Sequence, residues 1–251
     1  YNHVAEPYAQ KENYYRTGIS VGDYPVDHHH KKNTDAPEVG FPPVPSFNVP
    51  MGSLISEKID GLIVSDKAIS VSNLINGSTR LQPVVLLTGQ AAGILGALSV
   101  KENKAPRDIP VRAVQQALLK KKAYIMPLFD VNPNDSDFEV IQKVAATGIL
   151  KTTGEAYQWA NRTWFYPERT ITEKEFTEGL NSFDNTFQIV NSNKVLTEKQ
   201  AFNYISLLSK QDITIESTAD KPVTKRALAQ MVDSLLTPFN KEIDFNGHYK
   251  K

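Results

Sequence analysis

The residues with the clearest chemical potential lie between positions 77 and 93, where the sequence reads GSTRLQPVVLLTGQAAG. Arg80 and Pro83 stand in a predicted loop, and the segment that starts at Gly89 is almost free of bulky side chains. A helix that begins at Gly89 would expose backbone N–H groups and the positive end of its dipole to an anionic or electron-rich ligand. The other interpretation is a glycine- and alanine-rich helix that packs closely on a sheet.

Three consecutive histidines form a second chemical candidate. On an extended segment His28 and His30 share one face while His29 points away, so at most two imidazoles can reach one ion. Asp27 and Asp35 are near in sequence, but the pattern marks no third ligand. We therefore predict no metal site, and an exposed polar loop is the simplest interpretation of these histidines.

The elements that must position these residues differ along the chain. Residues 1–50 hold seven of the fifteen prolines, which predicts a front part rich in turns and loops. Alternation predicts a strand over 18–26, and 61–64 is a short apolar run. From about residue 108 the apolar spacing predicts helices. The helical ranges are 111–122, 138–147, 173–180, 198–208 and 225–236. The chain therefore reads as α+β, with short strands first and helices after them.

Several segments of the front part occur in a family-specific order. They are 23–28 (DYPVDH), 49–55 (VPMGSLI), 60–64 (DGLIV), 69–70 (IS) and 77–93. This series resembles the C-terminal portion of bacterial FAD-dependent oxidoreductases related to fumarate-reductase-type flavoproteins. The resemblance implies FAD as cofactor, with the helix that begins at Gly-Gln-Ala-Ala-Gly stabilising negative charge on the reduced flavin. It implies flavin contacts from Arg80, Gln82, Pro83, Gly89, Gln90 and Ala91, and a proton donor at His28 or His29.

The sequence also departs from this family. Residues 65–70 read SDKAIS where the family has Ala-Gly-Arg-Cys-Ile-Ser, and Asn73 stands where a histidine is common. No G-x-G occurs in the 251 residues, although the turn that seats a dinucleotide needs one. We therefore expect this chain alone to bind FAD poorly. Its expected partner is an N-terminal dinucleotide-binding part of the same protein, and Tyr1 then lies inside a longer flavoenzyme.

The back part carries a weak repeat. The motifs are 129–131 (FDV), 148–150 (GIL), 164–168 (WFYPE) and 171–172 (IT), with an eroded second copy at 223–226, and Ile171 and Val223 align at an offset of 52 residues. This pattern resembles surface-layer-homology repeats, which implies an all-α tandem helical domain and binding to cell-wall polysaccharide. Residues 1–124 are then the C-terminal, flavin-closing portion of a Rossmann-type flavoprotein, and residues 125–251 form the helical domain. The alternative is a tail that only packs against the flavoprotein body.

Two local features of the back part allow sharper predictions. Thr172 with Glu175, and Thr197 with Gln200, have the spacing of the capping box at a helix start. The aromatic residues of this region could stack on a sugar, although aromatics at this density more often form a core. These residues are Trp159, Trp164, Phe165 and Tyr166.

The composition argues against nucleic-acid binding, membrane association and cysteine chemistry. Lys+Arg and Asp+Glu are both 28, so no net charge attracts nucleic acid or anionic lipid. The apolar stretch 81–100 is interrupted by Gln82, Thr88 and Gln90, which predicts no transmembrane segment. The absence of cysteine excludes disulfides and thiolate chemistry.

Two hypotheses result from the sequence. The first is the C-terminal part of an FAD-dependent oxidoreductase, and the second is a non-catalytic envelope module that binds carbohydrate or protein. Together with the surface-layer resemblance, the lack of cysteine suggests a periplasmic, secreted or cell-envelope setting. Relatives of this kind are sometimes labelled xanthan lyases, but the spacing reveals no lyase constellation.

Overall fold

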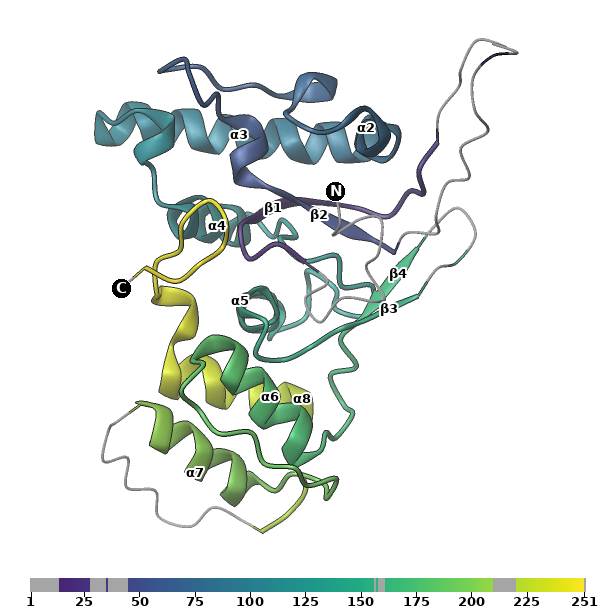
Figure 1. Ribbon diagram of the computed structural model, residues 1–251, viewed down its shortest axis with the longest axis vertical. Helices are drawn as coiled ribbons and strands as arrows, with labels where there is room; N and C mark the ends of the chain where they lie inside the picture. Colours follow the sequence, from purple (N-terminus) through teal and green to yellow (C-terminus); the bar gives the residue numbers. More distant parts are fainter. Residues whose placement is uncertain are drawn as a thin grey trace.

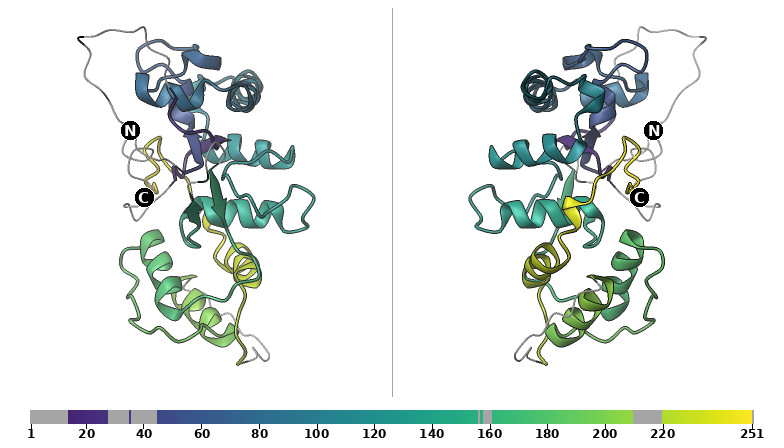
Figure 2. Two further views of the ribbon diagram at one scale, coloured as in Figure 1. Left: turned by 90° about the vertical axis from the view of Figure 1, so that its right-hand side faces the viewer. Right: turned by 90° about the vertical axis from the view of Figure 1, so that its left-hand side faces the viewer.

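The computed structural model describes residues 14–27, 35, 45–155, 157, 161–209 and 220–250. The described chain is a stack of layers (Figure 1). Helices α2 (Asn73–Thr79) and α3 (Gln82–Glu102) lie at one end, followed by a two-stranded sheet and α4 (Val111–Lys120). Next comes α5 (Phe138–Thr147), and a group of helices forms the other end (Figure 2).

The front sheet pairs β1 (Gly18–Gly22) with β2 (Phe47–Pro50) in antiparallel register. The strand predicted over 18–26 is therefore confirmed for its first five residues. Gly18 is required by close packing, because a Cβ there would lie 2.0 Å from Nδ2 of Asn48. The apolar run 61–64 contributes one isolated bridge, Ile55 to Ile63, instead of a strand.

Helix α3 lies across β1 and buries one face of its length. Val84, Thr88, Ala91 and Leu95 are buried at spacings of three and four residues, which is the periodicity of a helix packed on one side. The Thr88 hydroxyl also lies 3.1 Å from the Ser20 hydroxyl of β1. A glycine- and alanine-rich helix packed on a sheet, the second interpretation of this segment, is thus what the structure contains.

The same helix meets a membrane-span criterion. Among the described residues, α3 is the one helix long and apolar enough to cross a membrane, with a mean hydropathy of 1.7 in its most apolar window and 22% of that window buried. The expectation that polar interruptions rule out this stretch is therefore wrong on length and composition. One helix of this kind is weak evidence for a membrane, because core helices of globular proteins meet the same criterion.

The back part contains β3 (Thr153–Glu155) paired with β4 (Arg162–Trp164), and α6 (Glu173–Phe183), α7 (Glu198–Ser209) and α8 (Lys225–Met231). After α8 the chain continues as a π-helical turn, Val232–Leu236, and a 3-10 turn, Pro238–Asn240. Each predicted helical range thus contains helix. The last range changes from α to π geometry after Met231.

Three threonines begin the helices of the back part and lie beside one another. Both predicted capping boxes are confirmed. Thr172 accepts from the Glu175 amide at 3.2 Å and Thr197 from the Gln200 amide at 3.3 Å, with the reciprocal bonds present. Thr224 caps α8 in the same way, through the Ala227 amide. The repeat therefore has a third member, at Thr197, between the two that the sequence indicated.

Backbone bonds join these three helix starts into one junction. The Leu196 amide donates to the Ile171 carbonyl at 2.9 Å, and the Val223 amide donates to the Leu196 carbonyl at 3.1 Å. A bridge between Thr170 and Thr224 connects the first segment to the last. We call residues 170–172, 195–197 and 222–224 the threonine junction.

One hydrophobic core runs through both parts of the chain. It includes Ile19 of β1, Leu118 of α4, Phe138 of α5, Phe176 of α6 and Ile243 near the C-terminus, and all five are buried. The two ends of the stack are therefore connected by continuous side-chain packing.

Candidate cofactor-facing site

The long helix of the candidate site begins earlier than predicted. Leu81 is its N-cap, with extended backbone, and Pro83 stands in the first turn. Proline favours this position because its fixed φ suits a helix and its missing N–H has no helical partner there. The prediction that the helix starts at Gly89 is therefore wrong, and the positive end of its dipole lies near Gln82.

This start changes which amides can meet a ligand. Gly89, Gln90 and Ala91 lie two turns inside α3, where backbone amides bond to carbonyls four residues earlier. The first turn contains the amides of Gln82 and Val84, whereas Pro83 has no N–H. The N-cap residue Leu81 makes no side-chain hydrogen bond to these amides. Gln82 and Pro83 are exposed, whereas Val84 and Ala91 are buried, so Gln82 carries the first-turn amide that a ligand can reach.

Arg80 is placed directly before this helix start. Its Nη2 donates to the Asp27 carbonyl at 3.1 Å, which ties α2 to the segment after β1. The Asp27 carboxylate accepts from the Tyr24 hydroxyl at 3.4 Å. Burial, followed by the charge of Asp27, raises the pKa of Tyr24, and burial raises the pKa of Asp23. Arg80 thus holds the chain at Asp27, one residue before the predicted catalytic histidines.

His28 and His29 themselves lie outside the described residues, as does His30. In the part of the chain that the structure describes, no group of three or more His, Cys, Asp or Glu could hold a metal ion. Asn73 is the first residue of α2, after the Ser72 hydroxyl, which accepts from the Ile75 amide at 3.2 Å.

Asp66, which the resemblance aligns with a glycine, has an unusual backbone. Its φ is 62°, in the left-handed region that favours glycine. Its carboxylate accepts from the amide of Lys67 at 2.7 Å, which partly compensates for this conformation. The backbone at this position is therefore suited to the glycine that the chain lacks.

The outer face of α3 is apolar and has little side-chain bulk. A Cβ added at Gly89 or Gly93 would meet nothing within 4 Å. On the same face Leu86 is 71% exposed, and Val100 is 83% exposed. Glycine inside a helix costs about 1 kcal/mol relative to alanine, so two exposed glycines one turn apart need a reason other than helix stability.

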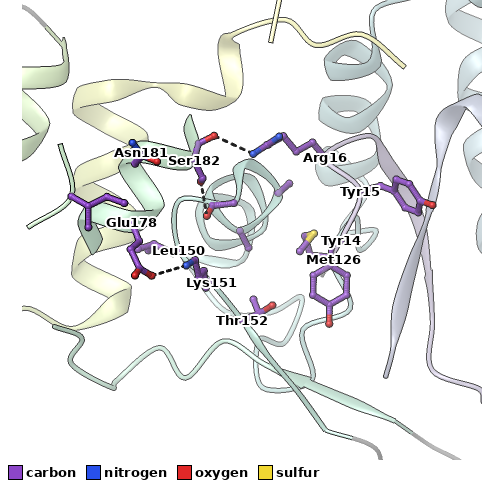
Figure 3. Close-up of a pocket in the computed structure, with 14 residues that line it drawn as sticks. Tyr14, Tyr15, Arg16, Met126, Leu150, Lys151, Thr152, Glu178, Asn181 and Ser182 are labelled. Atoms are coloured by element: carbon purple, nitrogen blue, oxygen red, sulfur yellow. Dashed lines mark hydrogen bonds and ion pairs between the residues drawn. The ribbon is translucent and has the colours of Figure 1, made fainter. Parts of the chain in front are cut away.

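A cavity of about 460 Å³ lies away from the predicted site residues, between residues 14–16 and helices α5 and α6 (Figure 3). Its charged groups are engaged with protein partners. Arg16 donates to the carbonyls of Thr147 and Ser182, and Lys151 pairs with Glu178 at 3.0 Å. The other lining residues are Tyr14, Tyr15, Met126, Ala145, Ala146, Gly148, Leu150, Thr152, Asn181 and Ile189. None of the predicted flavin contacts lines this cavity.

The aromatic residues of the back part divide between core and surface. Phe165 is fully buried, as the core interpretation predicts, and Trp159 lies outside the described residues. Trp164 stacks on Tyr166 with ring centroids 5.7 Å apart, and Phe129 meets the Trp164 ring edge to face at 5.0 Å. Phe129 is 60% exposed and Tyr166 39% exposed. These three side chains form an exposed aromatic cluster.

Three cations with structural contacts were not predicted, and two of them, Arg112 and Lys225, are buried. Arg16 joins the front to the ends of α5 and α6, Arg112 lies in the first turn of α4, and Lys225 begins α8. Arg112 and Lys225 stand in helices, where sequence reasoning places charged residues on the solvent face. We find no sequence signal that marks them.

Comparison with known proteins supports the front part alone. Residues 3–118, a little under half of the chain, match the model of the FAD dependent oxidoreductase family. No curated protein and no solved structure matches the chain. The matched range includes Arg80, the start of α3 and its outer face, and ends inside α4.

The described residues fit one end of FAD. The uncapped first turn of α3 offers the amide of the exposed Gln82 and a positive dipole, which suit the electron-rich edge of a flavin ring. The other end of FAD needs a strand, a glycine-rich turn and a helix, and the sequence has no G-x-G for such a turn. The chain thus has groups for the ring and lacks the motif for the pyrophosphate.

Proposed function

We propose that this chain supplies the ring-facing side of the flavin site in an FAD-dependent oxidoreductase. The observation that carries the proposal is the uncapped start of α3 next to Arg80, inside the range that matches the family model. When bound, FAD supplies hydride transfer chemistry. The chain's own part is to hold and polarise the ring.

The proposed roles follow from position. The amide of Gln82 donates to the ring edge, and Pro83 keeps the first turn helical without an N–H of its own. Arg80 positions the backbone at Asp27 and thereby the segment that continues into His28 and His29, the proposed proton donors. Gly89, Gln90 and Ala91 act through the helix they belong to, because their amides are already bonded inside it.

The proposed partner is a dinucleotide-binding part of the same protein, packed on the outer face of α3. Glycine and alanine on a helix surface let another backbone approach closely. The exposed apolar side chains Leu86 and Val100 are then covered. This packing explains why a helix with membrane-like hydropathy occurs in a chain with many charged residues.

A flavin measurement tests this proposal. The polypeptide that contains these 251 residues together with the dinucleotide-binding part is purified, and its absorbance in the flavin band is compared with that of the chain alone. We expect bound flavin in the first and little in the second, and a loss of flavin with Arg80→Met. Arg169→Met is the matched control, because Arg169 is an exposed arginine of the back part. A colourless protein after addition of FAD contradicts the proposal.

A second proposed function concerns the exposed aromatic cluster of Phe129, Trp164 and Tyr166. Exposed aromatic rings suit the apolar face of a sugar, and the Trp164 ring is held in place by its hydrogen bond to Glu155 at 3.1 Å. One face of the Phe129 ring is covered by the Arg162 guanidinium at 4.9 Å. A cell-envelope carbohydrate is the proposed ligand, in the periplasmic, secreted or envelope setting suggested by the sequence. A glycan array tests it with Trp164→Ala, and with Tyr204→Phe, a change away from the cluster, as the control. Equal signals from both variants contradict the proposal.

A further inference from the structure

A buried arginine in α4 carries a charge that its surroundings do not balance. Arg112 is 4% exposed and lies in the first turn of the helix. Its guanidinium stands over the ring of Phe239 at 4.2 Å, beneath the C-terminal segment 238–250. Figure 1 shows this segment beside α4.

Among the residues that the structure describes, one nitrogen of this guanidinium has an acceptor. Nη1 donates to Oε1 of Gln115 at 2.8 Å. The Gln115 side chain is fixed in turn, because its Nε2 donates to the carbonyls of Arg16 and Gly18. Nε and Nη2 of Arg112 are buried and have no partner among the described residues.

The two unpaired nitrogens lie on the same edge of the guanidinium. Nε and Nη2 point their N–H bonds side by side, and this edge matches two oxygens of a carboxylate or phosphate. A water molecule can accept one of these bonds but cannot neutralise the charge. The open edge therefore favours an oxyanion.

No carboxylate offsets the charge of Arg112 among its described neighbours. Burial lowers the pKa of Arg112 to about 10, Tyr249 acts in the opposite direction, and Arg16 lowers the pKa by a smaller amount than Tyr249 raises it. Arg16 and Lys241 both stand over the Tyr249 ring, at 5.2 and 5.1 Å. In the part of the chain that the structure describes, no carboxylate bonds to Arg112. Burying an unpaired charge is costly, and an anion removes that cost.

We propose that Arg112 binds a small oxyanion, a carboxylate or phosphate group, side-on through Nε and Nη2 beneath segment 238–250. Because Arg112 is buried, the anion enters while this segment is open and is enclosed when it closes. The segment is held by the bridge between Ile243 and Tyr249 and by the Tyr249 hydroxyl, which donates to the Thr147 carbonyl at 3.3 Å. This site is separate from the proposed flavin site and does not depend on it.

Thermal unfolding in different sodium salts tests the proposal. At equal ionic strength, we expect phosphate and acetate to raise the unfolding midpoint in proportion to the logarithm of their concentration, beyond the effect of chloride. The larger of the two effects identifies the preferred oxyanion. Arg112→Met should lose this dependence. Arg112→Lys keeps the positive charge but not the two side-by-side N–H donors, and should lose most of the dependence. Arg169→Met is the matched control and should keep it.

Two results overturn the proposal. One is a rise in midpoint that is the same in Arg112→Met as in the unchanged chain. The other is an unchanged chain that responds to phosphate and acetate as it does to chloride. If Arg112→Met does not fold, hydrogen exchange in the unchanged chain decides. Phosphate or acetate must slow exchange of the amides in segment 238–250, and no slowing by either overturns the proposal.

Discussion

The start of α3 in the front and the threonine junction in the back differ in how their first-turn amides are satisfied. In the back, α6, α7 and α8 begin at threonines whose hydroxyls accept first-turn amides. In the front, α3 begins at Leu81 without a side-chain cap and leaves an exposed face, although its neighbour α2 is capped by Ser72. The threonine junction thus satisfies its first-turn amides within the chain, whereas the start of α3 leaves the Gln82 amide to another molecule. The difference supports a cofactor-facing role for the start of α3 and a structural role for the threonine junction.

The largest expected effect concerns the joint between the two parts. Arg16→Met removes charged hydrogen bonds to the carbonyls of Thr147, Ser182 and Gly247, which connect the front to three segments of the back. We expect the free energy of unfolding to fall by about 4 kcal/mol. Chemical denaturation measures it. The exposed Arg169→Met should cost less than about 1 kcal/mol. Equal losses in the two variants would show that Arg16 does not join the parts.

The next effect is a pH dependence located in the back part. Lys225 is buried, and its Nζ donates to the carbonyls of Lys151 and Phe165, both at 2.6 Å. Burial lowers its pKa from 10.5 to about 8. Between these two values the unfolded chain holds a proton that the folded chain has lost, so stability increases as pH rises from about 8 to 10.5, and this contribution is constant below pH 8.

The size of this rise is about 3 kcal/mol. Urea unfolding at several pH values, compared between the unchanged chain and Lys225→Met, measures the contribution. Lys221→Met, an exposed neighbour, is the control and should keep the rise. If the unchanged chain and Lys225→Met have the same pH dependence, Lys225 is not its source.

Removing a helix cap of the threonine junction should lower the free energy of unfolding by a smaller amount. Thr172→Ala and Thr197→Ala each remove an oxygen that accepts a first-turn amide, and we expect a loss of about 1 kcal/mol for each. Thr186→Ala, an exposed threonine outside the junction, should change stability by less than about 0.5 kcal/mol. Losses at Thr172 and Thr197 as small as that at Thr186 would mean that the back part does not depend on its caps.

The smallest effect is expected in the front, at Asp66. Asp66→Gly removes the strain of a positive φ and should stabilise the chain by up to about 1 kcal/mol. The loss of the hydrogen bond from the Lys67 amide to the Asp66 carboxylate reduces this gain. Thermal unfolding measures the change. Asp60→Gly, at an exposed position without a positive φ, should not stabilise the chain. A destabilised Asp66→Gly contradicts the strain argument.

Local rules predicted the back part better than the front. The capping boxes at Thr172 and Thr197 depend on side chains three residues apart, so the sequence contains all that is needed to place them. The sequence predicted a helix start at Gly89, because small residues dominate the segment after Thr88. The start lies at Gln82 instead, and Pro83 in the first turn is the stronger signal for it. Arg16 and Arg112 could not be identified, because their partners are up to about 230 residues away in sequence.

We propose that the outer face of α3 receives the dinucleotide-binding part and thereby completes the flavin site. Gly93→Leu tests it most directly, because the added side chain meets only open space in this chain. In the chain alone, we expect the free energy of unfolding to stay the same or to increase by up to about 1 kcal/mol. In the polypeptide that also contains the dinucleotide-binding part, we expect Gly93→Leu to lose its flavin absorbance, while Asn203→Leu, at an exposed position of α7, keeps it. A Gly93→Leu protein with its full complement of flavin would contradict the claim.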